Sequence, residues 1–372
     1  MDLKELKAKL AAAKTKEGKV SLLDSYAEDL FEKGKYPDAG RFFAQALALA
    51  KAPNTRAYLA GPIGICNYNS GNDKEALAFL MKSARWFDKT KPEFMPDMCG
   101  FVYFHLGSLF EYQGKQAKSL EARHICERYA ESQEKDTKWM LFAGISRNCE
   151  TLGRHDEAIQ YSQKAIQILS DNDPSLSYLY ESMGKNHMSL QQHQEAINYF
   201  SKVIDLDPNF ERRDEIQLKV AECYHQLTNH RSALETYGKI LELKQLTGRR
   251  ENLTWLYVKL AHCHFSLDQF EKSLLMTLEA LRRQPKDKGE RAELRSYLTT
   301  NYYEIGRYKE AILEGEKTLK LARRFPEDSP FYFRLALAYF KTGDMNSFTR
   351  YRTLCRKLFP EDSWNKYLEK LR

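Results

Sequence analysis

The residues of this 372-residue chain that are best suited to chemistry are three neighbours, His262, Cys263 and His264. Imidazole nitrogen and thiolate sulfur are ligands that zinc and copper prefer. Successive residues of a helix, however, point about 100° apart, so these three cannot converge on one ion. His225 and His262 could face each other from adjacent helices, which leaves a metal-binding pair open. We favour the alternative that these side chains pack between helices, and we expect neither a metal nor a cofactor.

Motifs for catalysis are missing from the sequence. It contains no G-x-x-x-x-G-K-[ST] phosphate loop, no G-x-G-x-x-G dinucleotide fingerprint and no H-E-x-x-H zinc motif. The G-x-S-x-G nucleophile elbow is missing as well. The seven cysteines are dispersed and form no C-x-x-C pair, which is typical of reduced core thiols in a cytoplasmic protein. We therefore expect a cytoplasmic protein without enzymatic activity.

Basic residues gather towards the C-terminus. The chain carries a formal net charge of +7, whereas residues 281–357 alone hold 18 Lys or Arg against 10 Asp or Glu. One hypothesis is a basic patch that binds an acidic partner, nucleic acid or phosphate. The alternative, favoured because these residues interleave with glutamates, is a solvated outer face of several helices. The candidate residues of the basic patch are Arg282, Arg283, Lys286, Lys288, Arg323, Arg324, Arg350 and Arg352.

The helices that would position all these residues are predicted by a motif that recurs nine times. In the first copy, two small residues, Ala27 and Ala39, and the bulky Phe43 surround Gly34. Each copy holds two stretches with apolar residues at i, i+3, i+4 and i+7, which is typical of amphipathic helices. Between them lies a tight turn, and glycine, which adopts a left-handed backbone at least cost, occupies six of the turn positions. The turns are predicted at residues 34, 71, 114, 153, 191, 228, 268, 306 and 343.

This alternation of small and large residues over residues 20–360 resembles the tetratricopeptide repeat (TPR) superfamily. The resemblance implies an all-α, right-handed solenoid of about nine helix-turn-helix pairs with terminal capping helices. The turns are 37 to 43 residues apart instead of about 34, so the chain resembles the long-repeat arrays of kinesin light chain, the Pins/LGN scaffolds and the Rap-type regulators.

The predicted domain organisation follows from the repeat. Residues 1–19 should form an N-terminal cap or tail, and residues 361–372 a C-terminal capping helix. Prolines predict two interruptions of the helical repeat. Pro92 and Pro96 predict a loop at residues 91–99. Gly61-Pro62 should kink the first helix of the second pair, and this kink could act as a hinge. The nine pairs are predicted near residues 20–52, 57–90, 100–132, 139–171, 177–210, 214–247, 254–286, 292–325 and 329–360.

The resemblance also implies a concave groove, lined by the first helix of each pair, that binds a partner. Aromatic and basic candidates are concentrated in the C-terminal half, where we expect the partner to bind. The alternative is that the long helices bury some of these residues against each other. The groove candidates are Tyr178, Lys185, His225, Trp255, Lys259, His262, Phe265, Tyr297, Tyr303, Phe333, Arg334 and Phe340. Further inward-facing candidates in the N-terminal half include Tyr68, Phe104, Tyr112 and Arg147.

The residues at the groove positions argue against a chaperone C-terminal tail as the partner. TPR co-chaperones hold a C-terminal carboxylate with Lys and Asn, yet none of the nine corresponding groove positions is Asn here. No apolar run approaches the length of a membrane-spanning helix, so no membrane partner is expected. We predict a non-catalytic scaffold or adaptor that binds a peptide or protein segment in the groove. The alternatives are a peptide- or ligand-gated regulator and, less supported, nucleic-acid binding through the basic patch.

Overall fold

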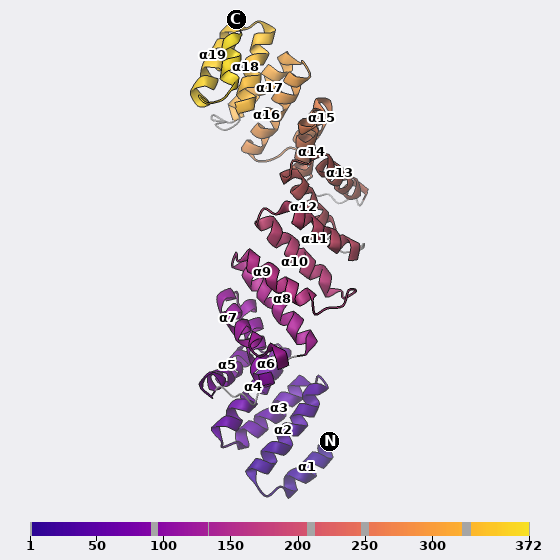
Figure 1. Cartoon of the computed structure of the whole chain (residues 1–372), viewed down its shortest axis with the longest axis vertical. Coiled ribbons are helices and arrows are strands. Elements are labelled where there is room, and N and C mark those ends of the chain that lie inside the picture. The colour runs from indigo at the N-terminus through magenta and orange to yellow at the C-terminus, as the bar shows by residue number, and fades with distance from the viewer. Residues whose placement is uncertain are drawn as a thin grey trace. The chain divides into compact units, whose positions relative to one another are not determined.

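The computed structural model of the chain consists, in its described part, of helices joined by short turns (Figure 1). The helices pack into two compact units, Met1–Gln192 (unit 1) and His193–Arg372 (unit 2). No helix in the described part combines the length and the apolar character needed to cross a membrane. The structure describes residues 2–90, 96–132, 134–206, 213–246, 253–321 and 329–371.

Unit 1 is a row of helix pairs. Each helix packs against the next, so that α2 pairs with α3, α4 with α5, α6 with α7 and α8 with α9. The first helices of successive pairs also contact one another, α4 with α6, α6 with α8 and α8 with α10, and together they line one face of the unit. The helices are α1 (Leu3–Ala12), α2 (Lys16–Glu32), α3 (Tyr36–Leu49), α4 (Pro53–Asn69), α5 (Asp73–Thr90), α6 (Pro96–Tyr112), α7 (Gln116–Glu127), η1 (Ala130–Ser132), α8 (Lys135–Thr151), α9 (His155–Ile166) and α10 (Ser175–Ser189).

Unit 2 repeats this arrangement. Here α12 pairs with α13, α14 with α15, α16 with α17 and α18 with α19, while α20 packs on α19. The single superhelix over residues 20–360 stays a prediction. The helices are α11 (His193–Leu206), α12 (Arg213–Gln226), α13 (His230–Leu246), α14 (Thr254–Ser266), α15 (Phe270–Arg282), α16 (Lys288–Glu304), α17 (Tyr308–Leu321), α18 (Ser329–Thr342), α19 (Met345–Leu358) and α20 (Trp364–Lys370).

All nine predicted turns have one backbone geometry. Their central residues take φ values between 55° and 80°, and three of them, Gln191, Thr228 and Asp268, are not glycine. In the first turn, Gly34 N–H donates to Phe31 O and Lys35 N–H donates to Leu30 O, each at 2.9 Å. The other eight turns contain the same two bonds, which define the Schellman motif and satisfy carbonyls that a helix end leaves unpaired. The sequence therefore predicts the positions of all nine turns correctly.

Small residues allow the paired helices to approach closely, as predicted. Ala27 and Ala39 are completely buried. A Cβ atom added at Gly64 would lie 2.6 Å from Leu80 Cγ and 3.0 Å from the Leu80 backbone nitrogen. Because backbone cannot move aside as a flexible side chain can, only glycine fits there. All seven cysteines are free and buried, which agrees with their interpretation as core thiols.

The structure bears on two proline predictions. Helix α4 continues through Pro62, so the proline does not end the helix, and a kink there stays a prediction. A Cβ at Gly61 would lie 3.1 Å from Met98 and Val102 side-chain atoms, so this glycine allows α4 to pack closely against α6. Pro96 begins α6, where its missing N–H costs no hydrogen bond, so residues 96–99 are helix and not loop. Residues 91–95 lie outside the described residues, and a hinge at Gly61-Pro62 stays a prediction.

The turn geometry makes a testable prediction. No atom lies within 4 Å of a Cβ added at Gly153, so Gly153→Ala changes only the cost of a backbone with φ of 74°. A left-handed backbone costs an L-residue about 1–2 kcal/mol, and chemical denaturation should show a destabilisation of that size. Gly238→Ala is the control, because Gly238 lies inside α13, also with open space, and should gain up to about 1 kcal/mol. Equal destabilisation by both substitutions would contradict this account of the turns.

Candidate functional site

A hollow of about 670 Å³, here called the aromatic groove, lies on the face of unit 1 formed by its first helices. Its walls come from α4, α6, α8 and α10, with one residue from α7 beneath. Five aromatic rings, two guanidinium groups and one carboxylate line it, and of the two guanidinium groups only that of Arg147 is exposed. The lining residues are Tyr68, Phe104, Ser108, Glu111, Tyr112, Arg123, Trp139, Met140, Ala143, Arg147 and Tyr178.

The apolar side chains of the aromatic groove are unusually exposed. Tyr112 is 82% exposed, Met140 40% and Tyr178 39%. Scattered exposed apolar residues are ordinary, but a contiguous group around a hollow marks a binding surface. Tyr is also enriched among the residues that dominate binding energy in protein interfaces. The hollow therefore has the composition of a partner-binding surface.

Arg147 of α8 stands in the middle of the aromatic groove in a fixed position. Its guanidinium lies 5.5 Å from the Tyr178 ring centroid, and its Nε lies 3.2 Å from Glu111 Oε1. The side chain is nevertheless 50% exposed. A planar guanidinium that is already oriented can receive a carboxylate in two parallel hydrogen bonds with little loss of side-chain entropy.

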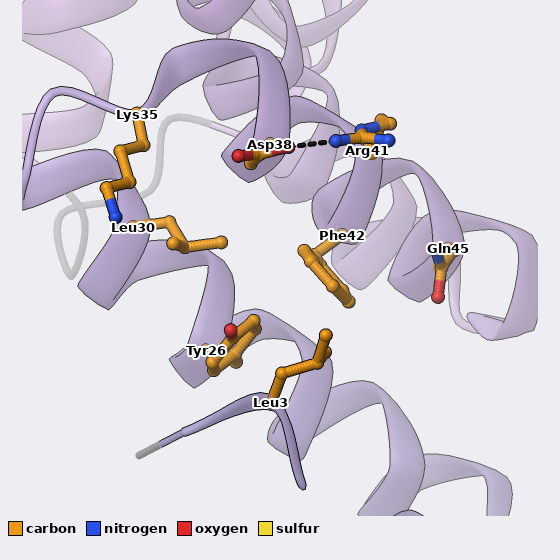
Figure 2. Close-up of a pocket in the computed structure, with 8 residues that line it drawn as sticks. All are labelled: Leu3, Tyr26, Leu30, Lys35, Asp38, Arg41, Phe42 and Gln45. Atoms are coloured by element: carbon orange, nitrogen blue, oxygen red, sulfur yellow. Dashed lines mark hydrogen bonds and ion pairs between the residues drawn. The ribbon is translucent and has the colours of Figure 1, made fainter. Parts of the chain in front are cut away.

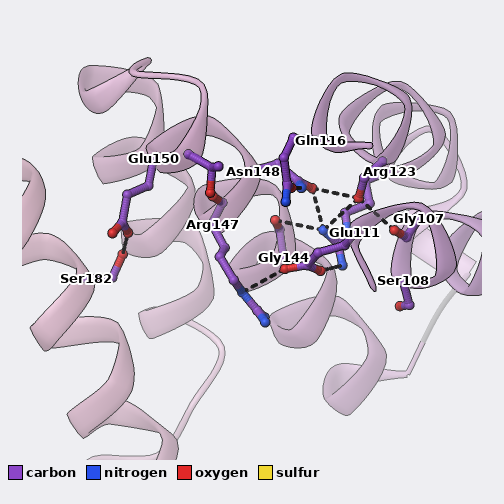
Figure 3. Close-up of polar contacts among 12 residues, drawn as sticks. Gly107, Ser108, Glu111, Gln116, Arg123, Gly144, Arg147, Asn148, Glu150 and Ser182 are labelled. Atoms are coloured by element: carbon purple, nitrogen blue, oxygen red, sulfur yellow. Dashed lines mark hydrogen bonds and ion pairs between the residues drawn. The ribbon is translucent and has the colours of Figure 1, made fainter. Parts of the chain in front are cut away.

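A buried polar network beneath the groove holds Glu111 in place (Figure 3). Arg123 of α7 donates from Nη2 to Glu111 Oε2 at 2.6 Å and from Nη1 to the Gly144 carbonyl at 3.0 Å. Arg123 also donates to Asn148 Oδ1, and its side chain is only 5% exposed. The network thus joins α6, α7 and α8, and it fixes the carboxylate that positions Arg147.

Two glycines create the space for Arg123. A Cβ added at Gly144 would lie 2.6 Å from Arg123 Cζ, and one at Gly107 would lie 2.8 Å from Arg123 Cγ. Burial lowers the pKa of Arg123 and Glu111 opposes that shift, so the guanidinium remains charged. Among the residues that line the aromatic groove, two guanidiniums face one carboxylate. The lining of the groove therefore carries a net positive charge.

A second hollow, the acidic hollow, lies further along the same face of unit 1. It measures about 520 Å³, and Glu28 and Glu32 of α2 line it together with apolar side chains of α4 and α6. Tyr58 Oη donates to Glu28 Oε1 at 3.2 Å. Nearby, burial and then the Glu28 charge raise the pKa of Asp24 to about 6. The face is thus acidic near α2 and basic near α8.

A third hollow, of about 330 Å³, lies beside α1 (Figure 2). Tyr26 of α2 and Phe42 of α3 meet there edge to face, with ring centroids 4.8 Å apart. Leu3 of α1 also lines it, and α1 buries Leu6 in the adjoining core. We assign this hollow to the packing of α1 on the first helix pair.

The groove candidates predicted from the sequence lie in different environments in the two units. In unit 1, Tyr178 lines the aromatic groove, whereas the Lys185 ammonium lies 2.6 Å from Glu181 Oε1. In unit 2, the rings of His225, His262 and Tyr297 form a row across α12, α14 and α16. Their centroids are 4.7 Å apart for the first pair and 6.5 Å for the second. The predicted facing of His225 and His262 is therefore present.

The remaining candidates in unit 2 range from exposed to fully buried. Trp255 is 37% exposed, while Arg334 lies over the Phe265 ring and donates from Nε to Glu304 at 2.6 Å. Phe333 is 1% exposed, which excludes it from a surface groove. The reason is the C-terminal helix: Trp364 of α20 stacks on Phe333 with ring centroids 6.1 Å apart. Lys259, Tyr303 and Phe340 are half-buried.

The described arginines of the basic patch make local contacts. Arg282 pairs with Glu279 at 2.7 Å, and Arg283 lies 4.6 Å from the Tyr257 ring centroid. Arg350 and Arg352 likewise lie over the rings of Tyr351 and Phe348 in their own helix. Lys286 and Lys288 are exposed, and Arg323 and Arg324 lie outside the described residues. These contacts are those of a solvated helix face.

Sequence reasoning missed the Arg123 network. A partial signal was present, because residue 123 lies nine positions after its turn, where four other repeats have a bulky apolar residue: Phe43, Leu80, Phe200 and Tyr237. The remaining four repeats have Ser162, Thr277, Gly315 and Arg352 at this position. A buried charge at a core position indicates a partner within reach.

The network makes a stability prediction. Arg123→Ala would leave Glu111 without its buried partner, and breaking such a pair costs about 3–5 kcal/mol. Chemical denaturation should therefore show a loss of about 3 kcal/mol. Arg154→Ala is the control, because Arg154 pairs with Glu157 at the surface with its side chain 50% exposed. That pair should contribute less than about 1 kcal/mol. Similar losses in the two variants would argue against a structural role for Arg123.

Comparison with known proteins agrees with the repeat architecture. A tetratricopeptide repeat family model matches residues 142–172 and 177–210. No curated protein matches the sequence. Among solved structures, the C-terminal part of a TPR repeat-containing protein from Cytophaga hutchinsonii is 18% identical, with 72% of this chain and 97% of that chain covered and a TM-score of 0.49. The apo form of RapI is 13% identical, with 91% and 97% covered and a TM-score of 0.49.

A third structure is YrrB, described as a TPR protein with an unusual peptide-binding site. It is 16% identical, with 56% of this chain and 98% of that chain covered and a TM-score of 0.43. Similarities at this level say nothing about the partner of this chain, so its function is argued from its own residues. The tetratricopeptide repeat model thus matches two of the repeats, and the nine turns of one geometry show that the same helix-turn-helix unit recurs through the described part of the chain.

Proposed function

We propose that the protein is a non-catalytic interaction scaffold and that unit 1 binds an extended segment of a partner protein in the aromatic groove. The observation that carries this proposal is the exposed cluster of Tyr112, Met140 and Tyr178 around an oriented Arg147. Exposed aromatic side chains around a partly desolvated arginine are the residue types that dominate binding energy in interfaces.

The charges on this face suggest the composition of the bound segment. Arg147 would pair with an Asp, Glu or terminal carboxylate, and the tyrosines would cover apolar side chains on either side. A segment long enough to reach the acidic hollow would place a Lys or Arg near Glu28 and Glu32. Electrostatic complementarity of this kind would set the direction in which the segment lies.

The two alternative functions gain no support from the contacts of the described residues. Regulation by a gating ligand would use a hinge at Gly61-Pro62 or at the loop predicted for residues 91–99; α4 is continuous at Pro62, and residues 91–95 lie outside the described residues. Nucleic-acid binding rests on the basic patch, whose described arginines contact neighbouring glutamate or aromatic side chains. Partner binding in unit 1 is therefore the function we put forward, and the cytoplasmic location stays a prediction.

Peptide display offers a direct test. Random peptides selected on the immobilised full chain should be enriched in aromatic and acidic residues. Their affinity should fall at least about 30-fold for Arg147→Glu, because an interface hot spot contributes about 2 kcal/mol or more. Tyr112→Ser and Tyr178→Ser should each weaken binding in fluorescence-polarisation titrations, with unchanged helicity by circular dichroism.

The matched control is Arg154→Glu. The side chains of Arg154 and Arg147 are equally exposed, at 50%, and each pairs with one glutamate, but Arg154 is the N-cap residue of the second helix α9 and does not line the groove. Arg154→Glu should leave the affinity unchanged. An equal loss of affinity in both charge reversals would show a nonspecific charge effect and would contradict binding in the aromatic groove.

A further inference from the structure

A second cluster of functional side chains lies in unit 2, apart from the aromatic groove. His225 of α12, His230 of α13 and Cys263 of α14 bring one possible ligand atom each to within 4.8 Å of the others. The His225 Nδ1 and Cys263 Sγ atoms are 3.9 Å apart. Cys263 is buried and the two histidines are half-buried, so the cluster has a floor in the core and an opening at the surface.

The repeat geometry produces this convergence. The left-handed turn at Thr228 reverses the chain between His225 and His230, which brings their rings to 5.5 Å. Helix α14 of the next repeat then packs against α13 and contributes Cys263. His264, one residue further on, points elsewhere, because its Nδ1 lies 2.9 Å from Gln269 Oε1. His264 is therefore not part of the cluster. Cys263 lies instead beside His225 and His230, which come from other helices.

We propose that His225, His230 and Cys263 bind one borderline divalent transition-metal ion, of which Zn²⁺ is the type. Zinc lies about 2.0–2.1 Å from imidazole nitrogen and about 2.3 Å from thiolate sulfur, with tetrahedral geometry. Nitrogen and sulfur ligands of one zinc ion are therefore about 3.6 Å apart. The 3.9 Å separation of His225 and Cys263 is close to that value, while ligand atoms up to 4.8 Å apart must move towards each other by side-chain rotation when the ion binds. Three protein ligands leave a fourth position for water or another ligand.

Two buried ring nitrogens at the cluster have no hydrogen-bond partner among the described residues, which supports the binding of an ion there. Within the described part of the chain, His230 Nδ1 and His262 Nδ1 are buried without a hydrogen-bond partner. His262 packs beside the three ligands, with its ring centroid 4.7 Å from that of His225 and 5.9 Å from that of His230. Burying polar atoms without a partner is costly, and a bound cation with its water would supply partners.

Metal binding changes the protonation of the ligands. Zinc binds neutral imidazole and thiolate, so each ion that binds releases the proton of the Cys263 thiol to solvent. The thiolate formed in this way offsets the repulsion between the ion and Lys259.

Cobalt provides the probe, because Co²⁺ accepts zinc ligands and a thiolate bond gives it a charge-transfer band in the near ultraviolet. Titration of the full chain with Co²⁺ should give this band with one ion per chain, and Zn²⁺ should displace it. Cys263→Ser should abolish the band. His230→Gln, a change at the half-buried rim, should weaken Co²⁺ binding at least about tenfold.

Two controls keep the test specific. Cys355→Ser removes a thiol that is as buried as Cys263 but lies in α19, and His264→Gln removes the histidine next to Cys263. Both variants should retain the band and the stoichiometry. Cys263→Ser could fail to fold, which circular dichroism would show. In that case the test is thermal unfolding: Zn²⁺ should raise the melting temperature of the wild type and should not raise that of His230→Gln. The absence of a cobalt–thiolate band in the wild type, or its loss in the controls, would overturn the proposal.

Discussion

The structure depends on one backbone device, a left-handed residue that closes each first helix and starts the second. Its two hydrogen bonds, such as Gly34 to Phe31 and Lys35 to Leu30, satisfy carbonyls at the helix end and fix the direction of the next helix. Because this device recurs at every turn, equivalent positions of successive repeats fall on equivalent faces. Side chains that are 37 to 43 residues apart in the sequence therefore become neighbours, and both proposed sites arise in this way.

The two sites depend on departures from the repeat pattern. Nine residues after its turn, the third repeat carries Arg123 where Phe43 fills the first. That substitution places a charge in the core, which Glu111 and Asn148 compensate, and Glu111 in turn positions Arg147 at the surface. In unit 2, His225 and His230 flank a turn and meet a thiol from the following repeat. A repeat protein thus acquires function where one copy differs from the others.

Periodicity predicts the repeat well because each turn has a strict conformational requirement. The prediction reached even Gln191, Thr228 and Asp268, where no glycine marks the turn and only the spacing indicates it. Exposure was harder to predict, because helical periodicity does not show what covers a face. Phe333 was expected in a groove, yet Trp364 of α20 stacks on it. Contacts between side chains distant in sequence, such as Arg123 with Asn148, require the tertiary structure.

The central claim is that the first helices of unit 1 form the surface that meets the partner. Hydroxyl-radical footprinting with mass spectrometry measures this most directly, since it reports the solvent exposure of single tyrosines in the complex. Oxidation of Tyr112, 82% exposed in the free chain, should fall sharply when a selected peptide binds. Tyr367 of α20, 49% exposed, should react equally with and without the peptide. Unchanged oxidation of Tyr112 together with protection of Tyr367 would contradict the account.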